Sequence, residues 1–158
     1  MATEGVLVHA SGVGEIIFPV TVNYDLSLVE MIAVGGYDWR NDDVTANHFP
    51  ISGNGQVEVN VELVHFNRIM ESDDVLEELD KAGLRPGELA ELASFGARYP
   101  DKQREFPIIS LGSVWRDRNG HRRVPGLWGN SGGRDLDLDW FERRWDDRYR
   151  FAAVRKSR

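Results

Sequence analysis

Two long segments in which apolar and polar residues alternate place the strongest constraint on the fold. In residues 15–24 the apolar positions on one face are Ile16, Phe18, Val20, Val22 and Tyr24. In residues 56–66 they are Val57, Val59, Val61 and Leu63. Strict alternation of this kind predicts β-strands with one face in the core and one face toward solvent, because successive side chains point to opposite sides.

Helical patterns separate these strands from the rest of the chain. Ser27 and Glu30 have the spacing of a capping box, which predicts a short helix that begins after Ser27. Acidic residues directly after Ser72 predict the start of a second helix, since carboxylates stabilise a helix N-terminus. Pro86 favours the first turn of a third helix, where its missing N–H is not needed. We therefore expect a helical pair over residues 73–98.

Strand patterns return after residue 105. The expected strands are 108–115, 121–128, 135–141 and 149–155, and Asn119-Gly120 between the first two is a strong hairpin signal. These patterns predict one α+β domain, residues 1–158, with an antiparallel sheet, a C-terminal four-stranded meander and helices packed on one face. Its core is expected to include Phe18, Val20, Val59, Val61, Leu92, Ile109, Leu111, Leu136, Leu138 and Trp140.

Composition excludes several classes of protein. A chain of 158 residues can bury a sufficient core without a disulfide or a metal. The chain contains no cysteine, which excludes disulfide scaffolds, thiolate metal sites and cysteine nucleophiles. No apolar run approaches the length of a membrane span, and the N-terminus lacks a signal-peptide pattern, so we expect a cytoplasmic protein. No phosphate loop or dinucleotide fingerprint is present, and no cofactor is expected.

Charge is distributed unevenly along the chain. The formal net charge is −7, yet residues 1–106 carry 7 basic and 19 acidic residues, whereas residues 107–158 carry 12 basic and 7 acidic residues. All but three of the 19 basic residues are arginine, which pairs with anions through two parallel hydrogen bonds. The sequence thus predicts a basic region on an acidic protein, suited to steering a charged partner or a second copy of the chain.

The C-terminal part resembles short, uncharacterised bacterial proteins. The similar segments are Leu84-Arg85-Pro86, Phe106-Pro107-Ile108-Ile109, Leu111-Gly112-Ser113, Arg123-Val124-Pro125 and Tyr149-Arg150-Phe151-Ala152-Ala153-Val154-Arg155-Lys156. This resemblance implies no particular activity, fold or ligand.

A second resemblance involves a glycine-rich segment. Gly129-Asn130-Ser131-Gly132-Gly133 resembles the Gly-Asp-Ser-Gly-Gly of chymotrypsin-like serine proteases, and Thr45-Ala46-Asn47-His48 resembles their Thr-Ala-x-His. The resemblance implies a nucleophile at Ser131 and a base at His48. Against it, Asn130 replaces the aspartate of the motif, and the expected helical pair does not fit a double β-barrel. A turn between two strands is the alternative interpretation.

Three alternating carboxylates form a second candidate site. Asp135, Asp137 and Asp139 share one face of a predicted strand, and two of them could bind Mg²⁺ with help from another strand. The alternative is a solvated face, or a ladder of opposite charges with Arg148 and Arg150.

Basic and aromatic residues together form a third candidate. Arg116, Arg118, Arg122 and Arg123 lie at one hairpin end, Arg148 and Arg150 lie further along the chain, and Trp115 and Trp128 lie on the neighbouring strands. Arginines beside exposed aromatic rings can hold phosphates and stack on bases. The alternative places these aromatic rings in the core.

No catalytic group of residues stands out from these patterns. The leading hypothesis is therefore a non-catalytic accessory protein that binds another protein or a second copy of itself. Nucleic-acid binding through the arginine-rich sheet is the second hypothesis. A hydrolase, using either Ser131 with His48 or the carboxylates of Asp135, Asp137 and Asp139, is the third.

Overall fold

The α+β class is confirmed by a computed structural model, which describes residues 6–7 and 16–156. The helices are α1 (Leu28–Gly35), α2 (Ser72–Lys81), α3 (Leu89–Arg98) and α4 (Lys102–Glu105). The strands are β1 (Val6–Leu7), β2 (Ile16–Asn23), β3 (Trp39–Arg40), β4 (Gln56–Val64), β5 (Met70–Glu71), β6 (Leu84–Pro86), β7 (Ile108–Ile109), β8 (Trp115–Arg116), β9 (Arg122–Asn130), β10 (Gly133–Trp140), β11 (Arg144–Trp145) and β12 (Arg150–Arg155).

One large sheet contains most of the strands, in the order β1-β2-β4-β12-β7-β9-β10-β3. β6 also pairs with β12, β8 pairs with β9, and β5 and β11 form a separate ribbon. Most pairs are antiparallel, but β3–β10 and β7–β12 are parallel. The C-terminal strands therefore lie side by side, with β12 next to β7 rather than next to β10.

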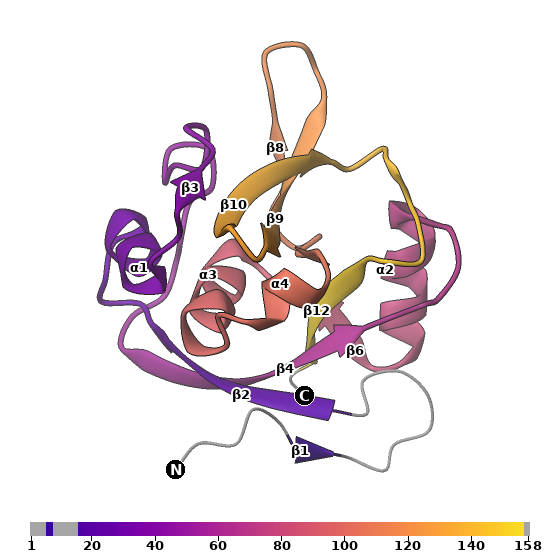
Figure 1. Cartoon of the computed structure of the whole chain (residues 1–158), viewed down its shortest axis with the longest axis horizontal. Coiled ribbons are helices and arrows are strands. Elements are labelled where there is room, and N and C mark those ends of the chain that lie inside the picture. Colours follow the sequence, from indigo (N-terminus) through magenta and orange to yellow (C-terminus); the bar gives the residue numbers. More distant parts are fainter. Residues whose placement is uncertain (1–5, 8–15, 157–158) are drawn as a thin grey trace.

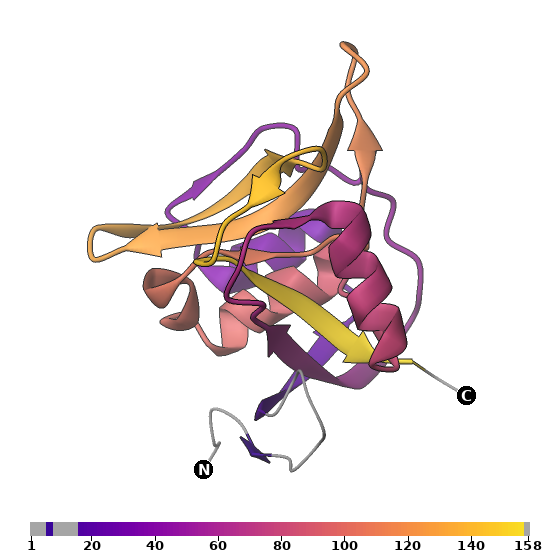
Figure 2. The same cartoon turned by 90° about the vertical axis from the view of Figure 1, so that its right-hand side faces the viewer.

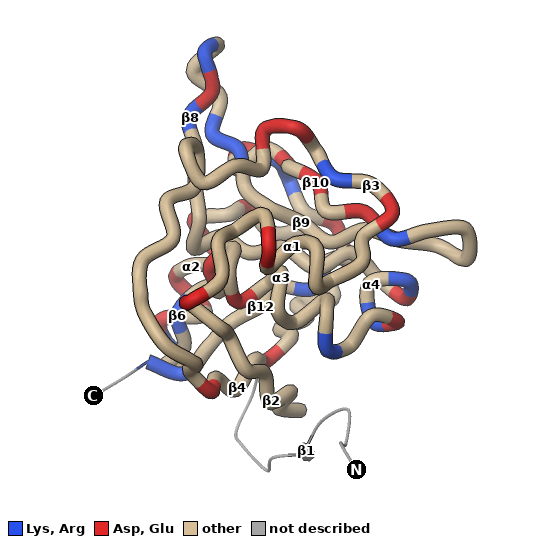
Figure 3. The backbone as a smooth tube through the Cα atoms, turned by 90° about the vertical axis from the view of Figure 1, so that its left-hand side faces the viewer, with Lys and Arg blue, Asp and Glu red and all other residues tan. Residues whose placement is uncertain are grey.

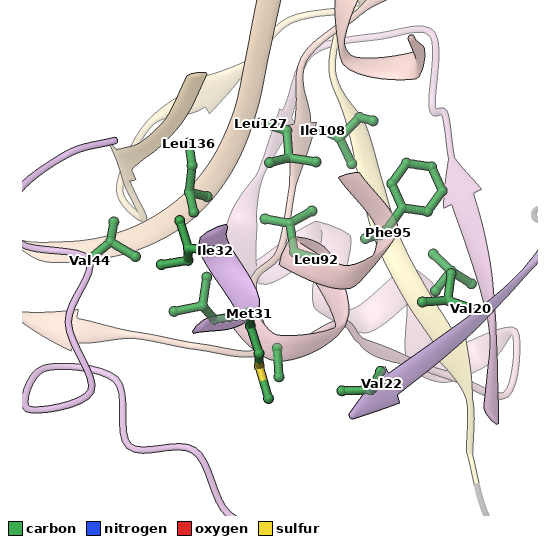
Figure 4. Packing of buried hydrophobic residues seen from close by; sticks show 14 of the residues in the cluster. Val20, Val22, Met31, Ile32, Val44, Leu92, Phe95, Ile108, Leu127 and Leu136 are labelled. Atoms are coloured by element: carbon green, nitrogen blue, oxygen red, sulfur yellow. The ribbon is translucent and has the colours of Figure 1, made fainter. Parts of the chain in front are cut away.

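The sheet curls around α3, which lies at the centre of the molecule (Figure 1). Leu89, Leu92 and Phe95 of this helix are fully buried, and the small residues Ala93 and Gly96 are buried with them. A capping box between Glu88 and Glu91 begins the helix. Figure 4 shows Leu92 and Phe95 among the inward-facing side chains of the sheet.

Two hydrophobic clusters lie on opposite faces of β12. Ala152 and Val154 belong to the cluster that contains α1 and α3, whereas Phe151 and Ala153 belong to the cluster that contains α2. The expectation that the helices share one face therefore holds for α1 and α3, but α2 covers the other face (Figure 2). The physical reason is that β12 is apolar on both faces, so both must be covered.

Two local expectations need correction. Pro86 ends strand β6, which pairs with β12, so the expected helical pair over residues 73–98 is two helices separated by a strand. Leu84 in this strand is buried, and burying it outweighs the weak helical preference of Pro86. Trp140, expected in the core beside Leu136 and Leu138, is 53% exposed at the end of β10.

The apolar residues of segment 5–10 also predict a strand, and of this segment only residues 6–7 are described, as β1. Among residues 6–7 and 16–156, no helix is long and apolar enough to cross a membrane.

Candidate functional site

Ser131 and His48 lie near opposite ends of β9. His48 stacks on Trp115, with ring centroids 3.8 Å apart, and Trp115 pairs with Arg123 near the start of that strand. Ser131 follows Asn130, its last residue, and seven residue steps correspond to about 23 Å. The structure therefore does not bring the expected nucleophile and base together.

The turn that contains Ser131 has its own structural explanation. The Asn130 side-chain oxygen accepts hydrogen bonds from the backbone N–H groups of Gly132 and Gly133, at 2.7 and 3.1 Å. Such side-chain bonds to the following backbone stabilise tight turns. The asparagine thus accounts for the β9–β10 turn.

The three carboxylates do share one face of β10, opposite the buried Leu136 and Leu138. Asp139 accepts hydrogen bonds from Trp128 Nε1 and Arg143 Nη1, each at 2.9 Å, and Asp137 accepts one from Asn41 at 3.0 Å. Burial raises the pKa of Asp139. Within the described part of the chain, no group of three or more His, Asp or Glu residues is arranged to hold a metal ion.

The arginines of the hairpin are partly engaged with acidic neighbours. Arg122 forms an ion pair with Glu142, and Arg123 Nη1 lies 3.7 Å from the Asp117 carboxylate. Arg116 donates a hydrogen bond to the Gly120 carbonyl at 2.7 Å. Arg118 is exposed near the hairpin tip.

Arg148 and Arg150 lie elsewhere, near the other end of β9. They line a pocket of about 410 Å³ with Arg104, Trp128 and Gly129. Arg148 is paired with Asp146 at 3.2 Å, and Arg150 lies 4.2 Å above the Phe106 ring, where burial lowers its pKa. The six predicted arginines therefore form two separate groups rather than one basic surface.

A groove lies beside β2, between this strand and the helices α1 and α3. Its volume is about 550 Å³, within the range of ligand sites in proteins. Its lining is mixed apolar and polar, and consists of Pro19, Thr21, Asn23, Leu26, Met31, Val34, Glu58, Ser94, Ala97, Arg98 and Tyr99. The groove thus has a strand on one side and two helices on the other.

The edge of β2 facing this groove carries unpaired backbone groups. Pro19 has no N–H, and its carbonyl accepts a hydrogen bond from the Tyr99 hydroxyl at 2.7 Å, so Pro19 directs its backbone away from β4. The Tyr24 N–H bonds to the Gly55 carbonyl, which places the even-numbered residues in the ladder with β4. Thr21 therefore points its N–H and carbonyl into the groove, and neither has a hydrogen-bond partner among the described residues.

The pairing of Thr21 with β4 does not depend on its outward-facing N–H and carbonyl. It pairs in register with Glu58, and its hydroxyl donates a hydrogen bond to the Glu58 carboxylate. β1 pairs with β2 only at Ile16 and Ile17, so within the described residues the edge is open from Phe18 onward. An open edge of this kind can accept another strand.

Arg134 joins the two helices that form the groove wall. Its guanidinium donates hydrogen bonds to the carbonyls of Gly35 at 2.7 Å, Gly96 at 2.6 Å and Pro100 at 3.0 Å. Gly35 ends α1 and follows Val34 of the groove, and Gly96 precedes Ala97 of the groove. The side chain therefore fixes α1 relative to α3, and with them the shape of the groove.

Helix carbonyls provide the negative charge around this buried arginine. Arg134 is 6% exposed and forms no ion pair with a carboxylate among the described residues. The carbonyl ends of α1 and α3 carry partial negative charge, which stabilises a cation there. The guanidinium also lies 4.6 Å above the ring of Tyr37, whose hydroxyl donates to the Ala93 carbonyl, and burial raises the pKa of Tyr37.

The sequence interpretation did not find this groove, although one signal was present. Proline within a strand occurs at sheet edges, where its missing N–H leaves no gap in the ladder. Pro19 therefore marked one edge of β2 as open. The helices α1 and α3 on the other side of the groove come from distant parts of the chain, and no pattern in their sequences indicates that they lie beside β2.

Comparison with known proteins provides no relative from which a function could be transferred. No protein-family model matches the chain, and no curated protein or solved structure is significantly similar to it.

Proposed function

We propose that this protein is a non-catalytic module that binds a partner protein through an extended segment, which adds as a strand to the edge of β2. The observation that supports this proposal is that the N–H and the carbonyl of Thr21 face the groove without a hydrogen-bond partner among the described residues. Addition of a strand to an open sheet edge is a general mode of peptide recognition.

The groove lining indicates the kind of segment that would fit. Main-chain hydrogen bonds to Thr21 would supply affinity, and alternate side chains would point toward the helices. Met31 and Val34 of α1 would contact an apolar side chain. Glu58 and Arg98 lie on the lining as opposite charges, so a segment with apolar and oppositely charged residues suits it best.

The test uses a matched pair of substitutions at Thr21. A fluorescein-labelled peptide, selected on the wild-type protein from a random heptapeptide library, serves as the probe in fluorescence polarisation. Thr21→Pro removes the N–H that faces the groove but leaves the ladder with β4 intact. Thr21→Val removes only the hydroxyl. We expect Thr21→Pro to weaken binding about fivefold relative to Thr21→Val, since a lost hydrogen bond contributes about 1 kcal/mol.

Two results would contradict the proposal. One is that no library peptide binds above background. The other is that Thr21→Pro and Thr21→Val bind the selected peptide equally, while circular dichroism shows both variants folded.

A further inference from the structure

The hairpin formed by β8 and the start of β9, which we call the basic hairpin (residues 115–123), projects from the body of the molecule (Figures 1 and 2). Its tip is braced internally, because the Asp117 carboxylate accepts hydrogen bonds from the N–H groups of Asn119 and His121, each at 2.9 Å. Gly120, with a φ of 84°, completes the turn. A braced projection of this kind loses little conformational entropy when it binds a partner.

The basic hairpin carries positive charge that its own chain does not neutralise. Arg116 and Arg118 are exposed, and neither forms an ion pair within the described residues. His121 stacks on the exposed ring of Trp140, with centroids 5.0 Å apart. Arginine and tryptophan are the residue types that contribute most at protein interfaces.

An acidic surface lies next to this hairpin. The exposed carboxylates of Asp73, Asp74 and Glu77 on α2 form what we call the acidic face, and they too have no ion-pair partner among the described residues. A hollow of about 160 Å³ is lined by Asp73 at the start of α2 and by Arg122 at the base of the hairpin, with Glu142 and Arg143 also in its lining. Both surfaces therefore lie on the same side of the molecule (Figure 2), and Figure 3, drawn from the opposite side, shows the basic residues along the projecting hairpin.

We infer that a second copy of the chain binds here, with the basic hairpin of each copy on the acidic face of the other. Two adjacent patches of opposite sign are self-complementary under two-fold rotation, so each contact occurs twice. Nucleic acid fits less well, because its phosphates would be repelled by the acidic face. The unpaired arginines and carboxylates would then pair between copies, with the Trp140 ring beside them.

The test reverses the charge of one patch at a time. The hairpin variant carries Arg116→Glu and Arg118→Glu, and the helix variant carries Asp74→Arg and Glu77→Arg. Sedimentation velocity at low salt measures the dissociation constant of the dimer. We expect each variant alone to raise this constant at least tenfold, because like charges then face each other. A control with Arg40→Glu and Arg104→Glu, both outside the groove and the two charged surfaces, has the same change in net charge as the hairpin variant, and we expect it to dimerise like the wild type.

A mixture of the hairpin variant and the helix variant shows whether the two surfaces bind each other. In an equimolar mixture, the acidic hairpin of one variant faces the basic helix of the other, and the basic hairpin faces the acidic helix. We expect a heterodimer with near wild-type affinity, weakened as ionic strength rises. The inference is overturned if the wild type is monomeric at about 100 µM, a concentration far above the dissociation constant of a specific interface. It is also overturned if neither variant dissociates, or if mixing restores no dimer.

Discussion

The groove beside β2 and the basic hairpin differ in how each surface is formed. The hairpin is continuous in sequence, convex, and presents charged side chains on a backbone whose turn is internally bonded. The groove is assembled from β2, α1 and α3, is concave, and presents an open backbone edge at Thr21. One surface is thus specified by local composition and the other by tertiary packing.

This difference shows why charge alone is an incomplete guide to a binding site. Most arginines of the basic C-terminal part are held by neighbouring groups, such as Arg122 by Glu142 and Arg148 by Asp146. Arg134 belongs to the same basic part of the chain, yet it is buried and supports the groove. Arg134 therefore supports the groove and adds nothing to a basic surface.

The largest effect is expected from Arg134→Met. The substitution leaves the buried carbonyls of Gly35 and Gly96, and the carbonyl of Pro100, without their donor. We therefore expect the free energy of unfolding to fall by about 3–5 kcal/mol. Urea denaturation measures it. Arg148→Met is the matched control, because Arg148 is exposed and its contacts, an ion pair with Asp146 and the ring of Tyr149, lie at the surface, and we expect a loss below about 1 kcal/mol.

Equal losses in the two variants would contradict the role assigned to Arg134. If Arg134→Met folds at low temperature, its affinity for the selected peptide gives a second readout. We expect that affinity to fall further than in Arg148→Met, because the groove walls are no longer joined.

A smaller effect is expected in the pH dependence of stability near the base of the hairpin. Burial raises the pKa of Asp139, so the folded state binds its proton more tightly than the unfolded state does. The stability of the wild type relative to Asp139→Asn should therefore fall as pH rises from about 4 through the raised pKa, by at most about 1.4 kcal/mol per pH unit.

Asp146 provides a control of opposite sign. Hydrogen bonds from Arg148 lower the pKa of Asp146, so its contribution to stability is present above its unfolded pKa and is lost as pH falls. The stability of the wild type relative to Asp146→Asn should accordingly rise with pH over the acidic range. Urea denaturation at a series of pH values measures both slopes, and slopes of the same sign in the two variants would contradict this assignment.

Features encoded by neighbouring residues could be predicted from the sequence. The capping box of Ser27 and Glu30 is present, with Glu30 N–H bonded to the Ser27 hydroxyl at 3.2 Å and Ser27 N–H bonded to Glu30 at 2.8 Å. The alternation in residues 56–66 corresponds to β4. In both cases the determining interactions span only a few residues.

Features that depend on distant contacts could not be predicted in this way. Pro86 lies in a strand because β12 pairs with it, a contact between segments more than sixty residues apart. Arg134 of β10 could not be distinguished from the surface arginines, since its acceptors are backbone carbonyls of the helices α1 and α3 and of the loop at Pro100. The positions of backbone carbonyls cannot be inferred from composition. For this reason the sequence did not indicate the groove beside β2.

Amide hydrogen exchange at Thr21 shows directly whether a bound peptide adds as a strand to the edge of β2. NMR would follow the exchange rate with and without the peptide selected from the library. We predict that the Thr21 amide exchanges at least tenfold more slowly in the complex, while the amides of Val20 and Val22, already bonded to β4, change little. An unchanged Thr21 amide, with protection confined to the basic hairpin, would contradict this prediction.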